Sequence, residues 1–393
     1  MEQNQIPRRN PKRRTPFQRN RRQQGQWLSY LLIGCVVLFL VLSLLVPDKE
    51  FSESENRSLA QRPKLSSIME GTFLSDLGDY FADQFPARDM WMSLNLGVNK
   101  LLGQKEASGV YLCEDDYLIQ VPSAPNQTQL DRNLAAVNAF AQNHPELKTV
   151  MAVVPNAVTI HADKLPENAP ARDQGADLVY IRGKLTDTDF VDVTKTLQAH
   201  SEEYLFYKTD HHWTSLGAAY AFKDIAAAMG IQAPELTEYT VYPVSTTFEG
   251  TLSSKSGSHS ARDTVDIYVP DSNIDYYVTY ADSGEDISSL YRREALGGKD
   301  HYTVFFGGNY SRVDITTTAN TGRCLLLFKD SYANCMVQFL YPYFDHITMI
   351  DPRYYYDNVE HVLTGNSITD VLFLYNADTF LGDTSLADVL VSE

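Results

Sequence analysis

From about residue 130 onward, hydrophobic residues form short unbroken runs and longer stretches at helical spacing. The short runs are rich in β-branched residues and end at polar residues or proline, which is typical of buried strands. They are Thr149–Val154, Phe190–Val193, Cys324–Phe328, His346–Ile350 and Val371–Tyr375. The helical stretches are 130–143, 215–229 and 331–341. Because strands and helices alternate, the sequence predicts an α/β domain with a mostly parallel sheet and helices on both faces.

Residues 231–322 differ in character from the segments on either side. They are rich in Thr, Ser, Tyr, Gly and Asp, and they contain few helical patterns. Two β-prone runs, Tyr276–Tyr280 and Tyr302–Phe306, indicate strands. The run Gly307–Asn309 is typical of a hairpin turn. We therefore expect a β-rich insertion within the α/β domain.

The first 75 residues predict a membrane anchor and a linker. Residues 1–26 carry eight bases and one acid, and residues 27–46 carry no charge. Twenty helical residues at ~1.5 Å rise span the ~30 Å hydrocarbon core of a bilayer. A cleaved signal peptide is the alternative, but its apolar region is usually only ~7–15 residues long. We expect a basic cytoplasmic tail (1–26), an uncleaved single-pass signal anchor (27–46), a polar stalk (48–75) and an extracellular domain (76–393).

The charge of the external part restricts its partners. The chain has 33 bases and 50 acids, and without residues 1–26 these totals fall to 25 and 49, a formal net charge of −24. Such a domain does not attract nucleic acid or anionic lipid by bulk electrostatics, whereas neutral or weakly charged glycans are compatible partners. Cys113, Cys324 and Cys335 lie outside the anchor and are too few for a disulfide framework. A Cys324–Cys335 bridge stays open in an oxidising compartment.

The segment Asp210-His211-His212-Trp213 carries the first candidate chemistry. A carboxylate two residues before an imidazole can reach a ring nitrogen when the backbone is extended or turned. That contact fixes the histidine tautomer and leaves the other nitrogen free to accept a proton from a nucleophile. We predict that Asp210 orients the base His212. In an extended segment His211 faces away and is structural or adjacent to substrate, while Trp213 serves either packing or sugar stacking.

Ser331 is the natural nucleophile for this base. The predicted strand 324–328 runs into Lys329-Asp330-Ser331, and a predicted helix follows. A serine in a strand-to-helix turn lies where α/β folds expose reactive groups, at the carboxyl ends of strands. Backbone N–H groups that open the helix can stabilise an oxyanion. A lone Asp-Ser pair is more often a helix cap, so the prediction depends on the strand, the helix and the Asp-x-His motif together.

These motifs resemble the DHHW proteins of Gram-positive bacteria, relatives of the alginate O-acetyltransferases within the SGNH-hydrolase-like group. The resemblance also includes Glu55–Ala60, Asp83–Arg88 and Val154–Asn156. It implies a three-layer α/β/α SGNH-hydrolase-like (flavodoxin-like) domain with a triad of Ser331, His212 and Asp210. The serine follows the Asp-His pair, the reverse of the order in ordinary SGNH hydrolases, and this arrangement resembles a circular permutation.

The permutation implies further site residues at the ends of the two strands after Ser331. Asn376 resembles the oxyanion asparagine of the family, and Tyr375 before it is a further candidate for contact with the oxyanion or substrate. Arg353, in Asp351-Pro352-Arg353, would neutralise developing charge or position an acetyl donor. Simpler roles stay open, namely a turn cap for Asn376 and an ion pair with Asp351 for Arg353. The glycine usual in Gly-Asp-Ser is Lys329 in this chain.

The resemblance implies an extracellular O-acyltransferase that acetylates a cell-surface or secreted polysaccharide. It also implies a membrane-bound O-acyltransferase as the partner that supplies the acyl group, and no metal or other cofactor. A carbohydrate esterase would use the same residues with water as the acceptor. A non-catalytic envelope scaffold is a further alternative. Asp-His-His also occurs in metal-dependent phosphoesterases, but the other seven histidines form no further ligand cluster in the sequence.

Overall fold

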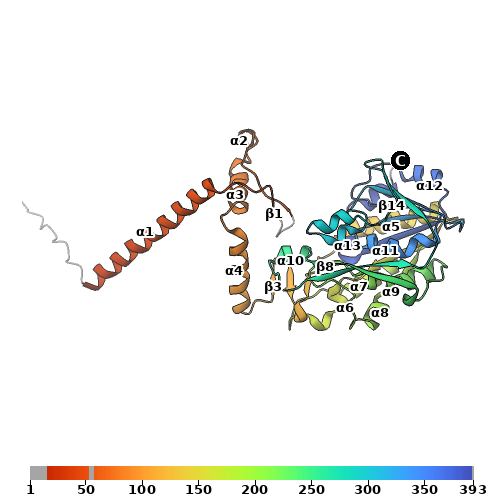
Figure 1. Cartoon of the computed structure of the whole chain (residues 1–393), viewed down its shortest axis with the longest axis horizontal. Helices are drawn as coiled ribbons and strands as arrows, with labels where there is room; N and C mark the ends of the chain where they lie inside the picture. The colour runs from red at the N-terminus through yellow and green to blue at the C-terminus, as the bar shows by residue number, and fades with distance from the viewer. Residues whose placement is uncertain (1–15, 53–56, 392–393) are drawn as a thin grey trace, which may run out of the picture. The chain divides into compact units, whose positions relative to one another are not determined.

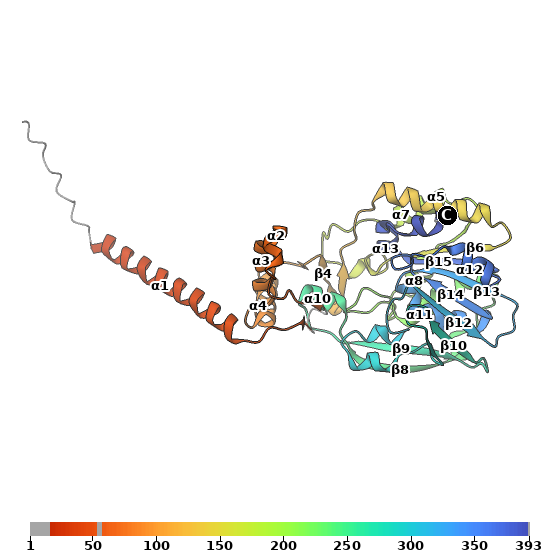
Figure 2. The same cartoon turned by 90° about the horizontal axis from the view of Figure 1, so that it is seen from above.

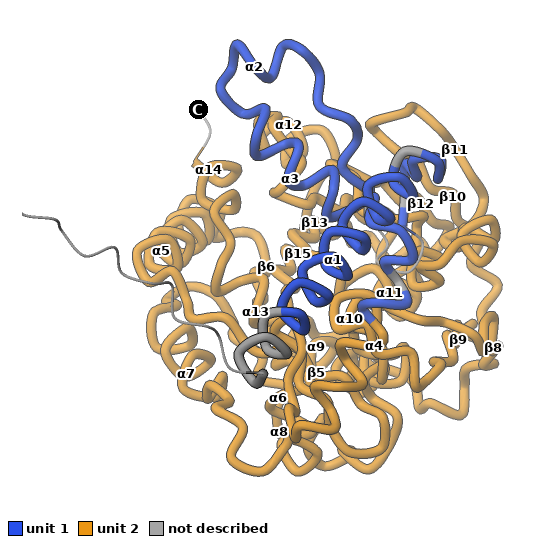
Figure 3. Tube along the Cα trace, turned by 90° about the vertical axis from the view of Figure 1, so that its left-hand side faces the viewer, with its two compact units in different colours: residues 1–52, 57–92 blue, residues 53–56, 93–393 orange. Residues whose placement is uncertain are grey.

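The computed structural model describes residues 16–52 and 57–391. The chain divides into two compact units (Figure 3). The first comprises residues 1–52 and 57–92, and the second comprises residues 53–56 and 93–393. The four cysteines, including Cys324 and Cys335, are free thiols, so the possible bridge is not formed.

The first unit begins with the long helix α1 (Pro16–Leu45). Its stretch Gln23–Ser43 is long and apolar enough to cross a membrane, judged by length and composition, and it overlaps the predicted span 27–46. Residues 1–15 of the predicted basic tail, and 53–56 of the predicted stalk, lie outside the described residues. The elements that follow are β1 (Phe51–Ser52), β2 (Arg57–Ser58), α2 (Ser66–Glu70), α3 (Phe73–Asp83) and α4 (Arg88–Leu101).

An eight-stranded sheet forms the centre of the second unit, with strand order β11-β10-β12-β14-β13-β15-β6-β7. The five strands from β14 to β7 in this order are parallel, and β12, β10 and β11 extend one edge as antiparallel strands. The strands are β6 (Lys148–Val154), β7 (Asp189–Val191), β10 (Tyr276–Tyr280), β11 (Glu285–Ile287), β12 (Arg312–Thr317), β13 (Cys324–Lys329), β14 (His346–Ile350) and β15 (Asp370–Asn376). The five strands predicted from apolar runs are thus present, and they form the parallel part.

Both faces of the sheet are buried, which explains why its strands are continuously hydrophobic. In β6, Val150 and Ala152 contribute to one core with α9 and α11, whereas Met151 and Val153 contribute to a second core with α5 and α7. Figures 1 and 2 show the chain in two views, and in Figure 2 α5 and the β8–β9 pair lie on opposite sides of the sheet. The main helices are α5 (Gln127–Asn143), α7 (Gln174–Lys184), α9 (Ser215–Ala228), α11 (Tyr332–Leu340), α12 (Val359–Gly365), α13 (Ala377–Gly382) and α14 (Leu386–Val391).

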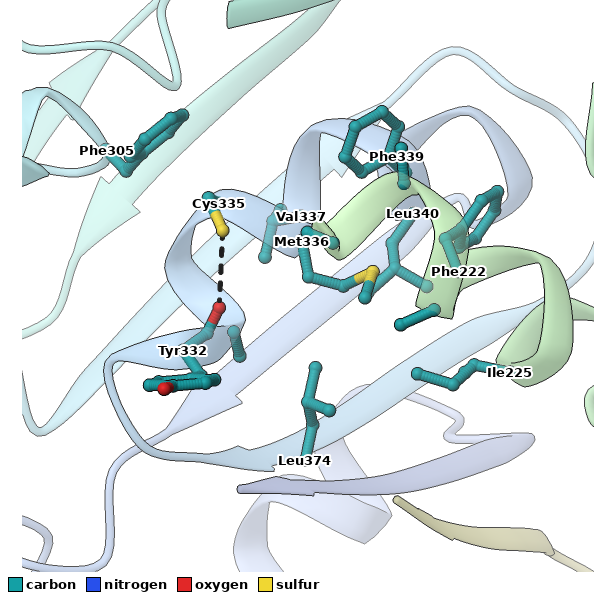
Figure 4. Close-up of a cluster of buried hydrophobic side chains, with 14 of the residues drawn as sticks. Phe222, Ile225, Phe305, Tyr332, Cys335, Met336, Val337, Phe339, Leu340 and Leu374 are labelled. Atoms are coloured by element: carbon teal, nitrogen blue, oxygen red, sulfur yellow. Dashed lines mark hydrogen bonds between the residues drawn. The ribbon is translucent and has the colours of Figure 1, made fainter. Parts of the chain in front are cut away.

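Helix α11 is almost wholly enclosed, and this fixes the turn in front of it. Figure 4 shows side chains of α11, among them Met336 and Leu340, gathered with Phe222 and Ile225 of α9 above Leu374 of β15. The remaining short elements are β3 (Glu106–Ala107), β4 (Val110–Leu112), β5 (Leu118–Gln120), α6 (Ala157–Ile160) and α8 (Thr194–Ala199). A buried helix start leaves little freedom to the residue that opens it, Ser331.

Within the region 231–322, the strands β10 to β12 extend the central sheet. Only β8 (Tyr239–Phe248) and β9 (Asp263–Pro270) form an antiparallel pair of their own, with α10 (Thr251–Ser256) between them. The strand predicted at Tyr302–Phe306 is wrong, since His301–Val304 forms a 3-10 helix. Tyr302 and the consecutive residues Val304, Phe305 and Phe306 are all buried in one core, whereas a strand would turn alternate residues away.

The glycine-rich run is also not a hairpin turn. Gly307 and Gly308 have φ values of +84° and +135° and join the 3-10 helix to β12, with no paired strand on the earlier side. These positive φ angles favour glycine because a Cβ would be strained there. The loop directs Asn309 towards the carboxyl end of β13, where its Oδ1 accepts a hydrogen bond of 3.0 Å from Lys329 Nζ.

The strand order places Ser331 at the point in the sheet where the strand connections change direction. Strand β13 lies between β14 and β15, so the chain connections that follow β13 and β14 lead to opposite sides. Open α/β sheets bind ligands at the carboxyl ends of strands at such a point. Ser331 comes two residues after β13 ends.

Candidate active site

Three side chains from two distant segments form one hydrogen-bonded chain. Asp210 Oδ1 lies 2.5 Å from His212 Nδ1, and His212 Nε2 lies 2.7 Å from Ser331 Oγ. An ionised carboxylate can only accept, so the Nδ1 of a neutral His212 carries the proton and its Nε2 faces the serine hydroxyl as an acceptor. This is the geometry in which an imidazole can take up the hydroxyl proton.

Asp210 is held in place by α10. Its Oδ2 accepts hydrogen bonds from the backbone N–H (2.8 Å) and the hydroxyl (2.9 Å) of Thr251. Burial opposes the charged form, but the neighbouring imidazoles of His211 and His212 and the hydrogen bonds from His212 and Thr251 outweigh it. The pKa of Asp210 is consequently held below its usual range. The residue before Thr251 is Gly250, and a Cβ added there would lie 2.3 Å from the Asp210 Cβ.

His211 lies against His212 and does not face away from it. The two ring centroids are 3.9 Å apart, and His211 Nδ1 lies 2.8 Å from Thr251 Oγ1. The predicted orientation is wrong because residues 208–212 form successive bends, in which neighbouring side chains do not alternate as they do in a strand. Burial and the electrostatic effect of the adjacent His212 ring lower the pKa of His211 to about 4, so this ring is neutral at pH 7.

Two of the aromatic residues predicted to contact substrate lie inside the core. Trp213 is 0% exposed, and its indole N–H donates to the Tyr332 carbonyl oxygen at 3.0 Å. Tyr375 is 1% exposed and packs against Phe380 in the core formed with α5. Neither ring offers a surface to a ligand, so the predicted substrate contact of Tyr375 is wrong, and of the two roles open to Trp213 the structure shows packing.

Asn376 ties the end of β15 to the turn before Ser331. Its amide nitrogen donates to Asp330 Oδ2 at 2.6 Å and to Thr379 Oγ1 at 2.7 Å, and its backbone N–H donates to the same Asp330 oxygen at 2.9 Å. Its side-chain oxygen caps α13. Both amide hydrogens are therefore in use, and Asn376 would have to release one of them to hold an oxyanion.

Asp330 is a second buried carboxylate beside the nucleophile. It is 0% exposed, and burial raises its pKa to about 6 although the backbone N–H groups of Asn376 and Tyr332 donate to it. Unlike Asp210, it receives no hydrogen bond from an imidazole or a cationic side chain within the described residues. Asp330 therefore connects the ends of β13 and β15 through hydrogen bonds.

Arg353 forms the ion pair that was the simpler of its two predicted roles. Its Nε and Nη2 bind the two oxygens of Asp351 at 2.8 and 2.6 Å. The Nζ of Lys329 lies 3.4 Å from the same carboxylate, and this lysine is 2% exposed, which lowers its pKa. The ammonium of Lys329 thus contacts both Asn309 and Asp351.

Two residues that contact the site, Tyr302 and Asp263, are not predicted from the sequence. The Tyr302 ring stacks on His212 with centroids 3.8 Å apart and an interplanar angle of 12°, and its hydroxyl donates to the Ser331 carbonyl oxygen at 2.8 Å. Asp263 of β9 accepts hydrogen bonds from the Lys208 N–H, the Thr209 N–H and the Thr209 hydroxyl, at 2.8, 2.8 and 2.5 Å. The sequence carries no signal for either, because one of 24 tyrosines and one of many acids are not distinctive.

Asp210, His211 and His212 also group their potential metal-ligating atoms within 4.8 Å of one another. Two ligands at ~2.0–2.2 Å from a tetrahedral ion lie roughly 3.3 Å apart. The 2.5 Å between Asp210 Oδ1 and His212 Nδ1 is shorter and matches a charge-assisted hydrogen bond. The geometry thus favours an oriented base over a metal centre.

The chain is thus an α/β protein in which a buried Asp-His pair faces a serine at the carboxyl edge of a parallel sheet. A profile of the DHHW protein family matches residues 96–350, and the chain belongs to that family. Among solved structures, a DHHW family protein from Eubacterium siraeum DSM 15702 is 25% identical with a TM-score of 0.63, and the match covers 72% of this chain and 95% of that one. Bacillus cereus PatB1, solved with a sulfonyl adduct, shares the fold at 22% identity, TM-score 0.59, and 70% and 97% coverage.

Curated relatives match a smaller part of this chain. The probable alginate O-acetylase AlgJ of Pseudomonas syringae pv. tomato is 23% identical over 214 residues, which cover 52% of this chain and 54% of the relative. The AlgJ protein of Pseudomonas aeruginosa is 24% identical over 176 residues, or 43% and 44% of the two chains. This chain therefore spans about half the length of the curated relatives that it matches.

Replacement of Gly250 tests the close approach of α10 to Asp210. We expect Gly250→Ala to lower the free energy of unfolding by about 1–3 kcal/mol, as overpacking does. The added methyl group must displace Asp210, so the NMR signal of the His212 Nδ1 proton should also move. Gly183→Ala in α7, which has open space around the new Cβ, is the matched control and should leave that signal in place. An unmoved His212 signal in Gly250→Ala would contradict the packing described.

The raised pKa of Asp330 predicts a pH dependence of stability. Its pKa is about 6 in the folded chain against an ordinary 3.8, so between about pH 4 and 6 the folded chain keeps a proton that the unfolded chain releases. The contribution of Asp330 to stability therefore falls as pH rises through this window. The unfolding free energy of wild type minus that of Asp330→Asn, measured in urea, should fall from pH 4 to 6 and level off above it. The exposed Asp189→Asn variant measures the background of removing a surface charge, and a difference that rises with pH would refute the assignment.

Proposed function

We propose that this protein is an O-acyltransferase that moves an acetyl group onto a cell-surface polysaccharide, with Ser331 as nucleophile, His212 as base and Asp210 as the group that orients the base. The observation that supports this proposal is the unbroken chain of contacts of 2.5 and 2.7 Å from Asp210 through His212 to Ser331. Ser331 is half-buried at the carboxyl edge of the sheet, where open α/β sheets bind ligands.

In the first half-reaction, Ser331 Oγ attacks the carbonyl carbon of the acyl donor while its proton passes to His212 Nε2. The new C–O bond gives a tetrahedral oxyanion, which collapses as the bond to the donor's leaving group breaks and His212 returns the proton to that group. An acyl-serine remains. Asp210 stays ionised throughout and stabilises the imidazolium, in line with its lowered pKa.

In the second half-reaction, a sugar hydroxyl attacks the acyl-serine while His212 takes its proton. Collapse of the second intermediate breaks the bond to Ser331 Oγ, returns the proton to that oxygen and leaves the acetyl ester on the sugar. Water in place of the sugar would make the protein an esterase, so the geometry of acceptor binding decides between transfer and hydrolysis.

The Ser331 N–H is the oxyanion donor that we assign. Among the described residues it donates to no backbone carbonyl or side chain. It opens α11, where backbone N–H groups favour a negative charge. Asn376 would join it only after giving up its bond to Asp330 or Thr379, as its amide is fully engaged.

The setting of this activity is part of the proposal. The domain has the three-layer SGNH-hydrolase-like arrangement, the anchor within α1 crosses the membrane once, and the basic N-terminus stays in the cytoplasm. The acyl group originates inside the cell, so a membrane-bound O-acyltransferase supplies it to the external domain. The names of the AlgJ relatives, probable alginate O-acetylases, support the reaction and the polysaccharide class, although those proteins match over about half their length.

Labelling with a sulfonyl fluoride tests the nucleophile without knowledge of the acceptor. Ser331 Oγ should form a bond to sulfur as fluoride leaves, while its proton passes to His212, and intact mass should show one adduct on the wild type. Ser331→Ala should take up none and should lower O-acetyl transfer by about 10³-fold or more. The exposed Ser123→Ala is the matched control and should behave as wild type.

Strains that carry the wild-type or the Ser331→Ala chain distinguish the directions of the reaction. Loss of O-acetyl groups from surface polysaccharide in the variant supports transfer, and a gain indicates esterase action. Equal labelling of both chains, together with unchanged envelope acylation, would overturn the enzymatic assignment in favour of a scaffold.

Tyr302 should act as a positioning residue for His212. Tyr302→Leu removes the ring that stacks on the imidazole, so we expect kcat to fall by about tenfold or more with KM unchanged, since a slight misplacement of the base is costly. Tyr302→Phe keeps the ring, loses only the bond to the Ser331 carbonyl and should recover most of kcat. The His212 ring protons should lose their ring-current shift in Tyr302→Leu alone. Equal losses in both variants would contradict a stacking role.

A further inference from the structure

A pocket lies beside the turn that follows β14. It has a volume of about 410 Å³, within the range of small-ligand sites. One wall comes from residues 352–357 and the other from the start of α14, residues 384–389. The side chains that matter for a ligand are Arg353, Tyr355, Tyr356, Asp357, Ser385 and Asp388.

An ionic network links this pocket to the strand that leads to the candidate nucleophile, Ser331. Its Arg353 binds both oxygens of Asp351, the residue that follows β14, and the Lys329 Nζ lies 3.4 Å from the same carboxylate. Lys329 is the last residue of β13, two positions before Ser331. The wall of the pocket and the nucleophile are therefore fixed to adjacent strand ends by one ionic network, at the same edge of the sheet.

One exposed aromatic ring lines the pocket. Tyr356 is 91% exposed, whereas Tyr355, which also lines the pocket, is buried. Tyr354 lies outside the lining, and the Arg353 guanidinium lies 5.4 Å from the centre of its ring. A tyrosine with so much of its ring in water gains nothing for the fold, and its flat apolar face suits the C–H face of a sugar.

The charges around the pocket suggest which sugar it takes. The only basic group in its lining, Arg353, is neutralised by Asp351 within the bidentate pair. Asp357 and Asp388 add two carboxylates, although Asp388 also pairs with Arg132. Carboxylates accept hydrogen bonds from sugar hydroxyls but repel a second carboxylate, and the segment after residue 26 has a formal charge of −24.

We propose that this pocket is an acceptor subsite for a neutral hexose unit of the glycan, stacked on Tyr356 and hydrogen-bonded by Asp357 and Ser385. The proposal rests on the transferase function proposed above and names its substrate class as a neutral polysaccharide rather than a polyuronate. The subsite holds the chain one or more sugars away from the residue whose hydroxyl meets the acyl-serine.

Calorimetric titration of the full chain in detergent micelles tests the subsite directly. The probes are neutral hexamers of glucose, mannose and galactose, and a mannuronate hexamer. At least one neutral hexamer should bind the wild type, and the mannuronate hexamer should bind at least about tenfold more weakly. Tyr356→Ala should weaken binding by about tenfold, a change of ~1.4 kcal/mol, because it loses the stacking face. Tyr356→Phe keeps that face and should bind within about twofold of wild type.

The matched control is Tyr277→Ala on β10, which removes a tyrosine that is 51% exposed and lies outside the pocket. Failure of every neutral hexamer to bind, tighter binding of the uronate, or equal weakening by Tyr277→Ala would overturn the subsite. The titration contains no acyl donor, so it is independent of turnover. Ser331-dependent transfer without glycan binding here would refute the subsite alone, and glycan binding without Ser331-dependent transfer would refute the proposed function alone.

Discussion

The site depends on keeping one buried carboxylate charged. Asp210 has lost nearly all contact with water, and a carboxylate in that position remains ionised only when hydrogen-bond donors and positive charge replace the solvent. The donors come from the His212 ring and backbone and from Thr251. Because Thr251 belongs to α10, the strands β8 and β9 on either side of that helix are part of the scaffold that holds the Asp210–His212 pair, and Asp263 of β9 binds the residue before Asp210.

Two acids flank the candidate nucleophile and are tuned in opposite directions. Asp210 has imidazole neighbours, which hold its pKa below the usual range. Asp330 is buried as deeply but is met by backbone and amide N–H groups, which do not outweigh desolvation, and its pKa rises to about 6. This contrast fits two different roles. Asp210 keeps a negative charge, which would stabilise an imidazolium on His212 in the proposed mechanism, whereas Asp330 holds its charge weakly and connects the ends of β13 and β15.

In the proposed function, the sheet edge links the nucleophile to the acceptor subsite. Lys329, Asp351 and Arg353 form an ionic network at the ends of β13 and β14, and the chain continues from it to Tyr356 of the pocket. Lys329 therefore has a structural use, since its ammonium contacts Asp351 in the turn after β14. In a reaction where water competes with a sugar hydroxyl, a rigidly placed acceptor subsite is the feature that favours transfer.

The sequence by itself determined the parallel part of the sheet, because strands buried on both faces must be continuously hydrophobic, and it placed Asp210 and His212 in contact because two residues of separation suffice. It also put Ser331 after a strand and before a helix. Tertiary structure alone decided the rest. The hydrophobic residues Val304–Phe306 predict a strand, but they are all buried in one core at the end of a 3-10 helix. Trp213 and Tyr375 are candidates for ligand contact in the sequence, but both are enclosed by packing in the structure. Tyr302, Thr251 and Gly250 reach the site through contacts between segments far apart in the chain, which no local pattern encodes.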